Sequence, residues 1–294
     1  MRVIMIIVAA ISSCAWGLTS ARADTEFRIC TGNKDSSHHG AGLKIAHELE
    51  DSEIEVQVIE TAGSVDNLQR IRESECDAVV VQADTYHIFK QDNPEAQLDV
   101  EFAGYLYDEY VHLFCNRDAG IDDVGDLESN PEDFTILIGS KGSSHAVTWR
   151  ALTQTDPDYA QVPTLAVDGA RAINKIVDGA DAQCLLYVGG LNSEFTRKAD
   201  LQGQFIKLVP VDDGDFDNFE DRSGWRIYEF KTIEGGTYPN TQGTYFAGIE
   251  TIAVAAILLI DLDWIEQNLR YYDEVADAVY AAHPAILRMV GQEK

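Results

Sequence analysis

Three short segments combine hydroxyl and glycine residues just before a helix-like apolar pattern, and two of them also contain histidine. They are residues 31–42 (TGNKDSSHHGAG), 61–67 (TAGSVDN) and 139–145 (GSKGSSH). Each segment places serine or threonine hydroxyl groups and free backbone N–H groups where a helix would begin. The positive end of a helix dipole at such a point favours a bound anion. These residue types therefore predict reversible binding of a small anion, with imidazole groups as further donors.

Each of these residues also has a purely structural explanation. Ser64 would only cap its own helix, and His38 and His39 would be partly exposed residues in a first helical turn. The pair Gly189-Gly190, at the end of a strand-like run, would serve close packing as readily as binding. The segments alone leave both explanations open.

Metal binding and catalysis have weaker support. A zinc site built from His38, His39 and His47 lacks the His-x-x-x-His spacing of a helical site, and the acidic tract 212–221 lacks the glycine and glutamate pattern of an EF-hand. The segment 139–145 is neither a phosphate-binding P-loop nor a nucleophile elbow. We expect no catalytic residues, no metal site and no cofactor.

The elements that must position these segments follow from apolar periodicity. The alternating residues 53–59 predict a strand, Val65, Leu68 and Ile71 recur at helical spacing, and the apolar run 78–81 suits a strand buried on both faces. Strand, helix and strand within about thirty residues form a right-handed βαβ unit. Further strands are expected at 27–30, 102–106, 110–115, 134–138, 164–167 and 182–188, and further helices at 43–49, 146–152, 168–177 and 263–286. The elements from residue 134 to residue 188 repeat the plan of the first unit.

The start of the chain reads as an export signal. Arg2 precedes an apolar stretch that ends in Ala21-Arg22-Ala23, a small-residue cleavage site, so we expect a signal peptide at residues 1–23 and a mature chain from Asp24. A loose lipobox ending at Cys14 is the alternative, and it would leave a lipid-anchored protein. The formal net charge of −28 excludes nucleic acid and anionic membranes as partners.

Two further features limit the class of protein. The apolar run 252–260 is far shorter than the roughly 20 residues a membrane-spanning helix needs, so we expect a buried core segment there. Cys30, Cys76, Cys115 and Cys184 follow the predicted signal peptide without any C-x-x-C pair. Export permits disulfides, and four cysteines allow three connectivities. We expect one disulfide or none.

The segment 61–84, TAGSVDNLQRIRESECDAVVVQAD, resembles the TxGSxxNLxxxxxGxxDxAxVQxD signature of the TAXI-type solute receptors of tripartite ATP-independent (TRAP) transporters. Further matches to the family's motifs lie in residues 31–42, 139–145, 179–189 and 233–240, so the resemblance covers nearly the whole mature chain. This chain departs from the family pattern at His38-His39, where paired tyrosines are usual. It also departs at Ser144 and His145, which replace a glycine and a threonine.

The resemblance implies an α/β, two-lobe periplasmic-binding-protein fold of the type II-like class, with a ligand cleft between lobes joined by a hinge. Lobe one would comprise residues 24–116 and 211–294, and lobe two residues 117–210. The expected function is that of a periplasmic receptor, not an enzyme, which closes on a small organic anion such as an amino acid, dicarboxylate or 2-oxo acid. It would act as a monomer and deliver this solute to TRAP membrane permease subunits.

Two alternatives remain open at this point: a periplasmic sensory receptor that serves a histidine kinase through the same fold, and a metal-binding protein or enzyme. The residues expected to bind the ligand come from the loops quoted above and from matching family positions. They are Thr31, Gly32, Ser36, Ser37, His38, His39, Gly63, Ser64, Asn67, Gln82, Asp84, Gly142, Ser143, Ser144, His145, Gly189 and Tyr238.

Overall fold

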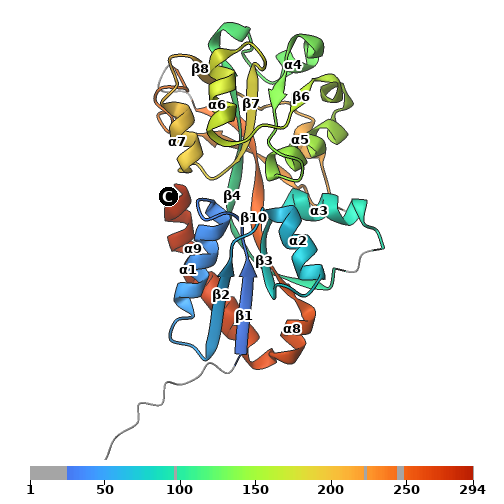
Figure 1. Cartoon of the computed structure of the whole chain (residues 1–294), viewed down its shortest axis with the longest axis vertical. Coiled ribbons are helices and arrows are strands. Elements are labelled where there is room, and N and C mark those ends of the chain that lie inside the picture. Colours follow the sequence, from blue (N-terminus) through green and yellow to red (C-terminus); the bar gives the residue numbers. More distant parts are fainter. Residues whose placement is uncertain (1–24, 96–97, 222–223, 244–247, 294) are drawn as a thin grey trace, which may run out of the picture.

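Two α/β halves share one ten-stranded sheet and are joined by two long strands, as the computed structural model shows (Figure 1). The structure describes residues 25–95, 98–221, 224–243 and 248–293. The predicted signal peptide and Cys14 therefore lie outside the described residues. The strand order is β2-β1-β3-β10-β4-β7-β5-β6, with β8 paired to β4 and β9 paired to β10. This arrangement confirms the expected two-lobe α/β fold.

The first half is built on three parallel strands, with β1 between β2 and β3. Its apolar core packs strand residues such as Phe27 against Ile45 of α1 and Val275 of α9. The helices thus cover the sheet through their apolar stripes, as the periodicity predicts. The elements are β1 (Thr25–Cys30), α1 (Ser37–Glu48), β2 (Ile54–Ile59), α2 (Ser64–Arg72), β3 (Ala78–Gln82), α3 (Ala83–Asp92), α8 (Leu262–Gln267) and α9 (Leu269–Val290).

The second half repeats the plan with shorter strands around β7, which pairs with β4 on one side and β5 on the other. Its elements are α4 (Gly125–Ser129), β5 (Ile136–Leu137), α5 (Ser144–Thr155), β6 (Thr164–Leu165), α6 (Gly169–Asp178), β7 (Cys184–Gly189), α7 (Glu194–Asp200), β8 (Ile206–Val209) and β9 (Tyr228–Ile233). Short 3-10 turns, Arg117–Ala119, Pro131–Asp133, Pro157–Gln161 and Phe216–Asn218, complete it.

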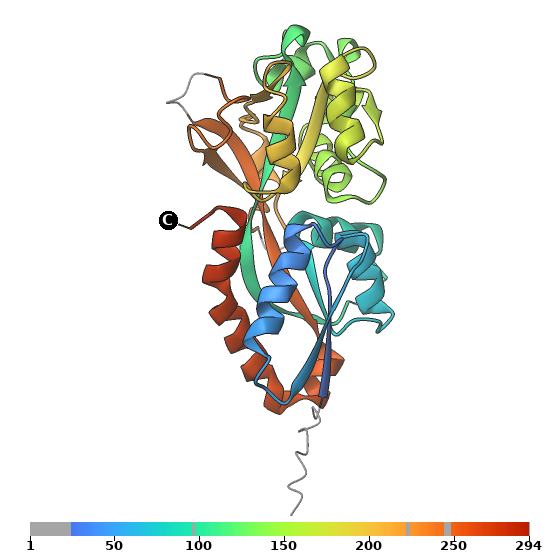
Figure 2. The ribbon, with the colours of Figure 1, turned by 60° about the vertical axis from the view of Figure 1, so that its left-hand side comes forward.

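The long strands β4 (Val100–Asn116) and β10 (Ile249–Asp261) run antiparallel through both halves (Figures 1 and 2). The sequence suggested two separate strands, 102–106 and 110–115, but β4 is continuous because its polar residues 107–109 keep an extended backbone paired to β10. The apolar run 252–260 lies within β10 and is almost wholly buried, as expected. Within the described residues, none of the helices combines the length and hydropathy needed to cross a bilayer.

The hydrophobic packing groups the residues that follow position 211 with the second half, whereas the sequence-based expectation assigned them to lobe one. Val211, Phe216 and Tyr228 pack in one cluster with Ile136 and Trp149 of the middle segment. Strand β9 pairs with the first part of β10, from Ile249↔Ile233 to Val254↔Tyr228. The described residues 211–221, 224–243 and 248–254 therefore lie with the second half, and the chain returns to the first half within β10. Sequence periodicity locates strands, but it does not show that one strand serves two cores.

The disulfide expectation was wrong, because the structure contains two disulfides, Cys30–Cys76 and Cys115–Cys184. Cys115 lies directly opposite Cys184 in the antiparallel β4–β7 pair. Cys30 ends β1 beside β3, and Cys76 lies two residues before β3. Each pair is far apart in sequence, by 46 and 69 residues, so only the strand pairing brings its members together.

Candidate functional site

A pocket of about 530 Å³ lies between the two halves, where several helices begin. The first residues of α1 and α2 line it from the first half, and those of α5, α6 and α7 from the second. Strands β4 and β7 contribute Glu109, Leu185, Tyr187 and Val188 to its wall. The pocket is thus bounded by five helix N-termini, whose backbone N–H groups have no intrahelical partner.

The local sequence explains why these helices begin at the pocket. The hydroxyl of Ser36 caps α1 by accepting a hydrogen bond from the backbone N–H of His39 at 3.1 Å, and Ser143 caps α5 through Ala146 at 3.3 Å. Helix α2 begins after Gly63, whose φ of +118° suits glycine. Serine caps and a glycine turn fix all three loops without occupying the space between the halves.

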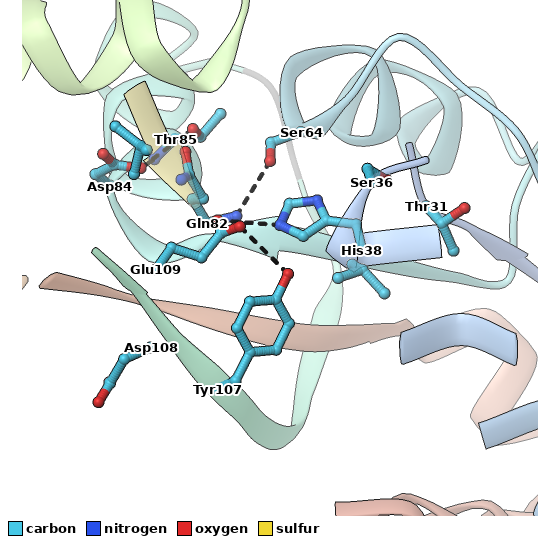
Figure 3. A network of polar contacts seen from close by, with 12 residues as sticks. Thr31, Ser36, His38, Ser64, Gln82, Asp84, Thr85, Tyr107, Asp108 and Glu109 are labelled. Carbon is cyan, nitrogen blue, oxygen red and sulfur yellow. Dashed lines mark hydrogen bonds and ion pairs between the residues drawn. The ribbon is translucent and has the colours of Figure 1, made fainter. Parts of the chain in front are cut away.

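The sequence-based alternative for Ser64 was wrong, because Ser64 does not cap α2. Gly63 occupies the N-cap position and Ser64 is the first helical residue. The Ser64 hydroxyl instead accepts a hydrogen bond from the backbone N–H of Gln82 at 3.2 Å (Figure 3). This contact ties the start of α2 to the end of β3, and it leaves the hydroxyl proton of Ser64 available for donation.

Hydroxyl groups dominate the polar lining of the pocket. Each serine hydroxyl carries one donor, and three of these serines belong to the first half of the molecule and four to the second. They are Ser36, Ser37, Ser64, Ser140, Ser143, Ser144 and Ser193. A small anion between the halves would therefore meet hydroxyl donors as well as helix N-termini from both sides.

His38 and Glu109 form a buried ion pair at the pocket wall (Figure 3). Nε2 of His38 lies 3.2 Å from Oε2 of Glu109, and the hydroxyl of Tyr107 donates to Oε1 at 3.2 Å. Burial disfavours the imidazolium form, but the Glu109 carboxylate and the backbone of Thr31 outweigh it, so the pKa of His38 is raised. The raised pKa favours the imidazolium form of His38 beside the Glu109 carboxylate.

His145 has the opposite charge preference. Its Nδ1 accepts a hydrogen bond from the backbone N–H of Val188 at 3.0 Å, and burial lowers the pKa of its imidazole. A neutral ring that accepts at Nδ1 carries its proton at Nε2. His145 is thus a neutral donor in the pocket wall. Its ring also contacts Tyr187, with centroids 4.9 Å apart.

Four carboxylate groups line the pocket alongside these donors. They belong to Asp35, Glu109, Asp168 and Glu194, whereas the lining cations are Lys198 and His38. Lys198 is already paired with Glu194 at 2.5 Å. Asp168 accepts hydrogen bonds from the backbone N–H of Ser140, at 2.9 and 3.1 Å, and so fixes the loop before α5. The side-chain charges of the lining are therefore net negative, in contrast to its helix N-termini.

The structure brings together about half of the predicted site residues. Those that line the pocket come from the three segments singled out in the sequence, and they are Gly32, Ser36, Ser37, His38, Gly63, Ser64, Ser143, Ser144 and His145. Gly142 lies beside them, close enough to the other half that a Cβ there would be 4.0 Å from Val65 of α2.

Four of the remaining predicted residues lie behind the pocket wall, in the loop after β1, the first turns of α1 and α2 and the end of β3; they are Thr31, His39, Asn67 and Gln82. Asn67 is buried and binds the carbonyls of Thr31 and Val80 at 2.6 and 2.8 Å, while the Thr31 hydroxyl bonds to Ile59. His39 contacts the Thr31 hydroxyl through Nδ1 at 3.0 Å. These side chains hold the loops in place. Both amide atoms of the buried Gln82 side chain have no hydrogen-bond partner within the described structure.

Asp84, Gly189 and Tyr238 occupy the junction between the halves. Asp84 accepts hydrogen bonds from Thr148 of α5 at 2.6 Å and Tyr228 of β9 at 2.8 Å. Gly189 pairs with Tyr110 of β4. The hydroxyl of Tyr238 donates to the Leu191 carbonyl at 2.7 Å and lies 2.9 Å from Nε2 of His112, whose pKa burial lowers to about 4.

Sequence reasoning missed the pocket residues that come from strands and from the later helices. Of these residues, Glu109 could have been predicted most easily from the sequence. An acidic residue directly before the apolar run 110–115 is unusual and indicates a buried polar contact. Asp168 had only a weak signal, as an acid just before a predicted helix. Lys198 had none, because α7 carries no motif.

The candidate metal-binding group within the described residues lies outside this pocket. His38 and His39 make separate contacts, to Glu109 and to Thr31. One group that could hold a metal ion occurs within the described segments, formed by Glu128, Asp156 and Asp213, whose oxygens lie within 4.8 Å of one another. It is part of the second half and includes a residue of the acidic tract.

Comparison with known proteins gives the same architecture. Residues 31–285 match the model of the NMT1-like family. The periplasmic aliphatic sulphonate binding protein SsuA from Escherichia coli is similar in structure, with a TM-score of 0.55, 17% identity and coverage of 90% of this chain and 74% of that chain.

Two further structures are similar at comparable levels. The substrate binding protein of a methionine transporter from Streptococcus pneumoniae has a TM-score of 0.51, 13% identity and coverage of 91% and 92%. The VFT2 domain of BvgS from Bordetella pertussis has a TM-score of 0.52, 8% identity and coverage of 92% and 93%. Identities this low show a shared two-lobe fold and leave the ligand to be inferred from the site itself.

Proposed function

Because this chain belongs to the NMT1-like family and has a two-lobe fold, we propose that it is an extracytoplasmic solute receptor. In this proposal it is not an enzyme, and it captures a small organic anion that carries a carboxylate, such as an amino acid, dicarboxylate or 2-oxo acid. The observation that carries the proposal is the meeting of helix N-termini from both halves at one pocket of about 530 Å³.

The N-termini of α1, α2, α5 and α6 supply the attraction for the anion. Neither α1 nor α5 has an acidic residue in its first turn, so the positive ends of these two helices are not neutralised there. Helix α2 has Asp66 in its first turn, and α6 has Asp168 as its N-cap. The hydroxyls of Ser37, Ser64 and Ser144 and the Nε2–H of neutral His145 add donors without adding charge. Neutral donors of this kind bind a carboxylate while letting it leave again.

Hinge closure follows from the position of the donors. A ligand that bridges the starts of α1 and α2 to the starts of α5 and α6 makes its full set of contacts only when the halves approach each other. Binding would therefore shift the receptor toward a closed state, since a ligand favours the state in which it has more contacts. The closed, monomeric receptor would then deliver its solute to membrane permease subunits of the TRAP type.

A thermal-shift screen of residues 24–294 against amino acids, dicarboxylates and 2-oxo acids tests the proposal. A ligand that binds only the native state raises the melting temperature with the logarithm of its excess over Kd. We expect at least one carboxylate to do so, and a chelator should not change the shift. A screen with no carboxylate hit would overturn the proposal.

A charge variant sharpens this screen. In Ser144→Asp, the new carboxylate lies in the first turn of α5, where it favours the helix but repels an anion in the pocket. We expect an unchanged or higher melting temperature without ligand and at least tenfold weaker binding. Ser129→Asp makes the same charge change on an exposed residue at the end of α4 and should bind as the unmodified chain does.

A further inference from the structure

We propose that Glu109 determines specificity by receiving a positively charged amino group of the ligand. This inference rests on the proposed function, and it narrows the solute class to a zwitterion that carries both a carboxylate and an ammonium group. Glu109 was not among the residues predicted from the sequence. Its assignment rests on its position, its hydrogen bonds and the distribution of charge around the pocket.

The side chain of Glu109 is almost completely buried in the wall of the pocket. It lies on β4 next to Tyr110, which pairs with Gly189 at the end of β7, and it lines the pocket while only 5% of its surface is exposed. A carboxylate buried to this degree is costly unless every part of it is paired. An unpaired charge in this wall of the pocket would therefore carry a large free-energy cost.

The hydrogen bonds of Glu109 are incomplete. Oε1 accepts one bond, from the hydroxyl of Tyr107, and Oε2 accepts one, from Nε2 of His38. An ionised carboxylate accepts about four hydrogen bonds in all. Figure 3 shows His38 and Tyr107 beside the Glu109 carboxylate; His38 lies on α1, and Tyr107 packs in the core of the first half. The remaining lone pairs are available to a donor in the pocket.

The charge distribution favours a cationic donor over a second anion. The imidazole of His38 is already paired with Glu109, and the ammonium group of Lys198 is already paired with Glu194. Asp35 and Asp168 add further negative charge to the lining. A dicarboxylate would place its second carboxylate in a net negative region, whereas an ammonium group there gains an attraction. The carboxylate of the same ligand would still meet the helix N-termini and serine hydroxyls.

His38 prepares Glu109 for this role. Its Nε2 lies 3.2 Å from Oε2 of Glu109, so a protonated imidazole there places a positive charge directly beside the buried carboxylate. The TAXI-type pattern that the sequence resembles has a tyrosine where this chain has His38, and a phenol would not supply a positive charge. A purely structural pair is the competing explanation. It predicts that loss of Glu109 weakens folding and leaves ligand discrimination unchanged.

The experiment compares ligands that share one carbon skeleton and differ only at the α position. Suitable series are L-glutamate, 2-oxoglutarate and glutarate, and L-leucine, 4-methyl-2-oxopentanoate and 4-methylpentanoate. Binding to residues 24–294 is measured by titration calorimetry. We expect the amino member of one series to bind at least about 30-fold tighter than its two analogues, the ratio typical of a buried charge contact.

The variant Glu109→Gln then tests the residue itself. It should reduce that ratio to below about threefold while the isolated protein still shows a cooperative melting transition. Glu50→Gln is the matched control, because it removes the acid of an exposed histidine–carboxylate pair, His47–Glu50, at the far end of α1. This control should keep the full ratio. If Glu109→Gln does not fold, the ratio measured on the unmodified protein still decides the question of ligand class.

The possible outcomes separate the two claims. If a 2-oxo acid or a dicarboxylate binds as tightly as the matching amino acid, the inference is overturned and the receptor function stands. If amino acids are preferred but Glu109→Gln retains the preference, the role given to Glu109 is overturned. If no member of any series binds, the proposed receptor function for carboxylates fails, and the inference fails with it.

Discussion

The hydroxyl of Thr148, on α5, donates a 2.6 Å hydrogen bond to the carboxylate of Asp84, which lies at the start of α3 in the other half of the molecule. The same oxygen also accepts a bond from Tyr228. Ile88 of α3 packs in the core of the second half. Asp92, at the end of α3, forms a bidentate ion pair with Arg150 of α5. Helices α3 and α5 thus form a continuous contact between the halves.

Replacing Thr148 by valine removes the hydroxyl and keeps the shape of the side chain. The Asp84 carboxylate, which is buried, then loses one donor. We expect the free energy of unfolding to fall by about 2 kcal/mol, within the range for removing one partner of a buried hydrogen bond. Urea denaturation measures this loss. The control is Thr153→Val on the same helix, whose hydroxyl bonds only to Arg150 one turn earlier, and a loss as large in that variant would contradict the assignment.

The ion pair between His38 and Glu109 predicts how stability depends on pH. The folded pKa of His38 is raised, so its contribution is complete below the unfolded pKa of about 6.5 and is lost as pH rises through the folded pKa. The pKa values of His112 and His145 are lowered, so their contributions change at lower pH. The unfolded forms of His112 and His145 also titrate near pH 6.5, so the contribution of His38 above pH 6.5 is obtained by comparing the unmodified protein with a variant that lacks His38.

The variant His38→Gln should lose less stability over that interval than the unmodified protein does. Denaturant titrations at half-unit steps of pH give the comparison. His47→Gln is needed as a control, because the pKa of His47 is also raised, by Glu50 at the surface. Identical pH profiles for His38→Gln and the unmodified protein would mean that the buried pair does not hold a proton more tightly in the folded state.

The two disulfides should contribute strongly to stability. They close loops spanning 46 and 69 residues, and the chain-entropy model gives about 4 kcal/mol for each. The double variant Cys115→Ser/Cys184→Ser should therefore melt well below the unmodified protein. Alkylation followed by mass spectrometry checks the pairing in residues 24–294. Unfolded protein should take up no label without a reductant and four labels with one, and labelling without a reductant would contradict the pairing.

The local parts of the fold could be predicted from the sequence. The βαβ unit around Ser64 and the loop–helix transitions at Ser36 and Ser143 are determined by neighbouring residues, because caps and apolar periodicity act over a few positions. For the same reason, half of the predicted site residues reach the pocket. The two-lobe architecture followed from the resemblance, which covers nearly the whole chain.

The remaining features depend on which strands become neighbours. Cys115 meets Cys184 through the register of β4 and β7, and Glu109 reaches the pocket only because β4 continues from one half into the other. Asn67 and Asp84 occupy positions of the TAXI-type motif, but neither lines the pocket. Asn67 donates to the Val80 carbonyl behind the pocket wall, and Asp84 accepts from Thr148 at the junction between the halves. A motif therefore identified residues that matter to the site without distinguishing those that line the pocket from those that support it.

The continuity of β4 also restricts how the length of this chain can change in evolution. Side chains alternate along a strand, and Figure 3 shows Asp108 and Glu109 pointing in different directions from adjacent positions. Inserting or deleting one residue between Val100 and Glu109 would move Asp108 or Tyr110 into the place of Glu109 and would also misalign the pairing with β10. Homologous chains should therefore vary in length in their surface loops and keep the number of residues in β4 and β10 constant.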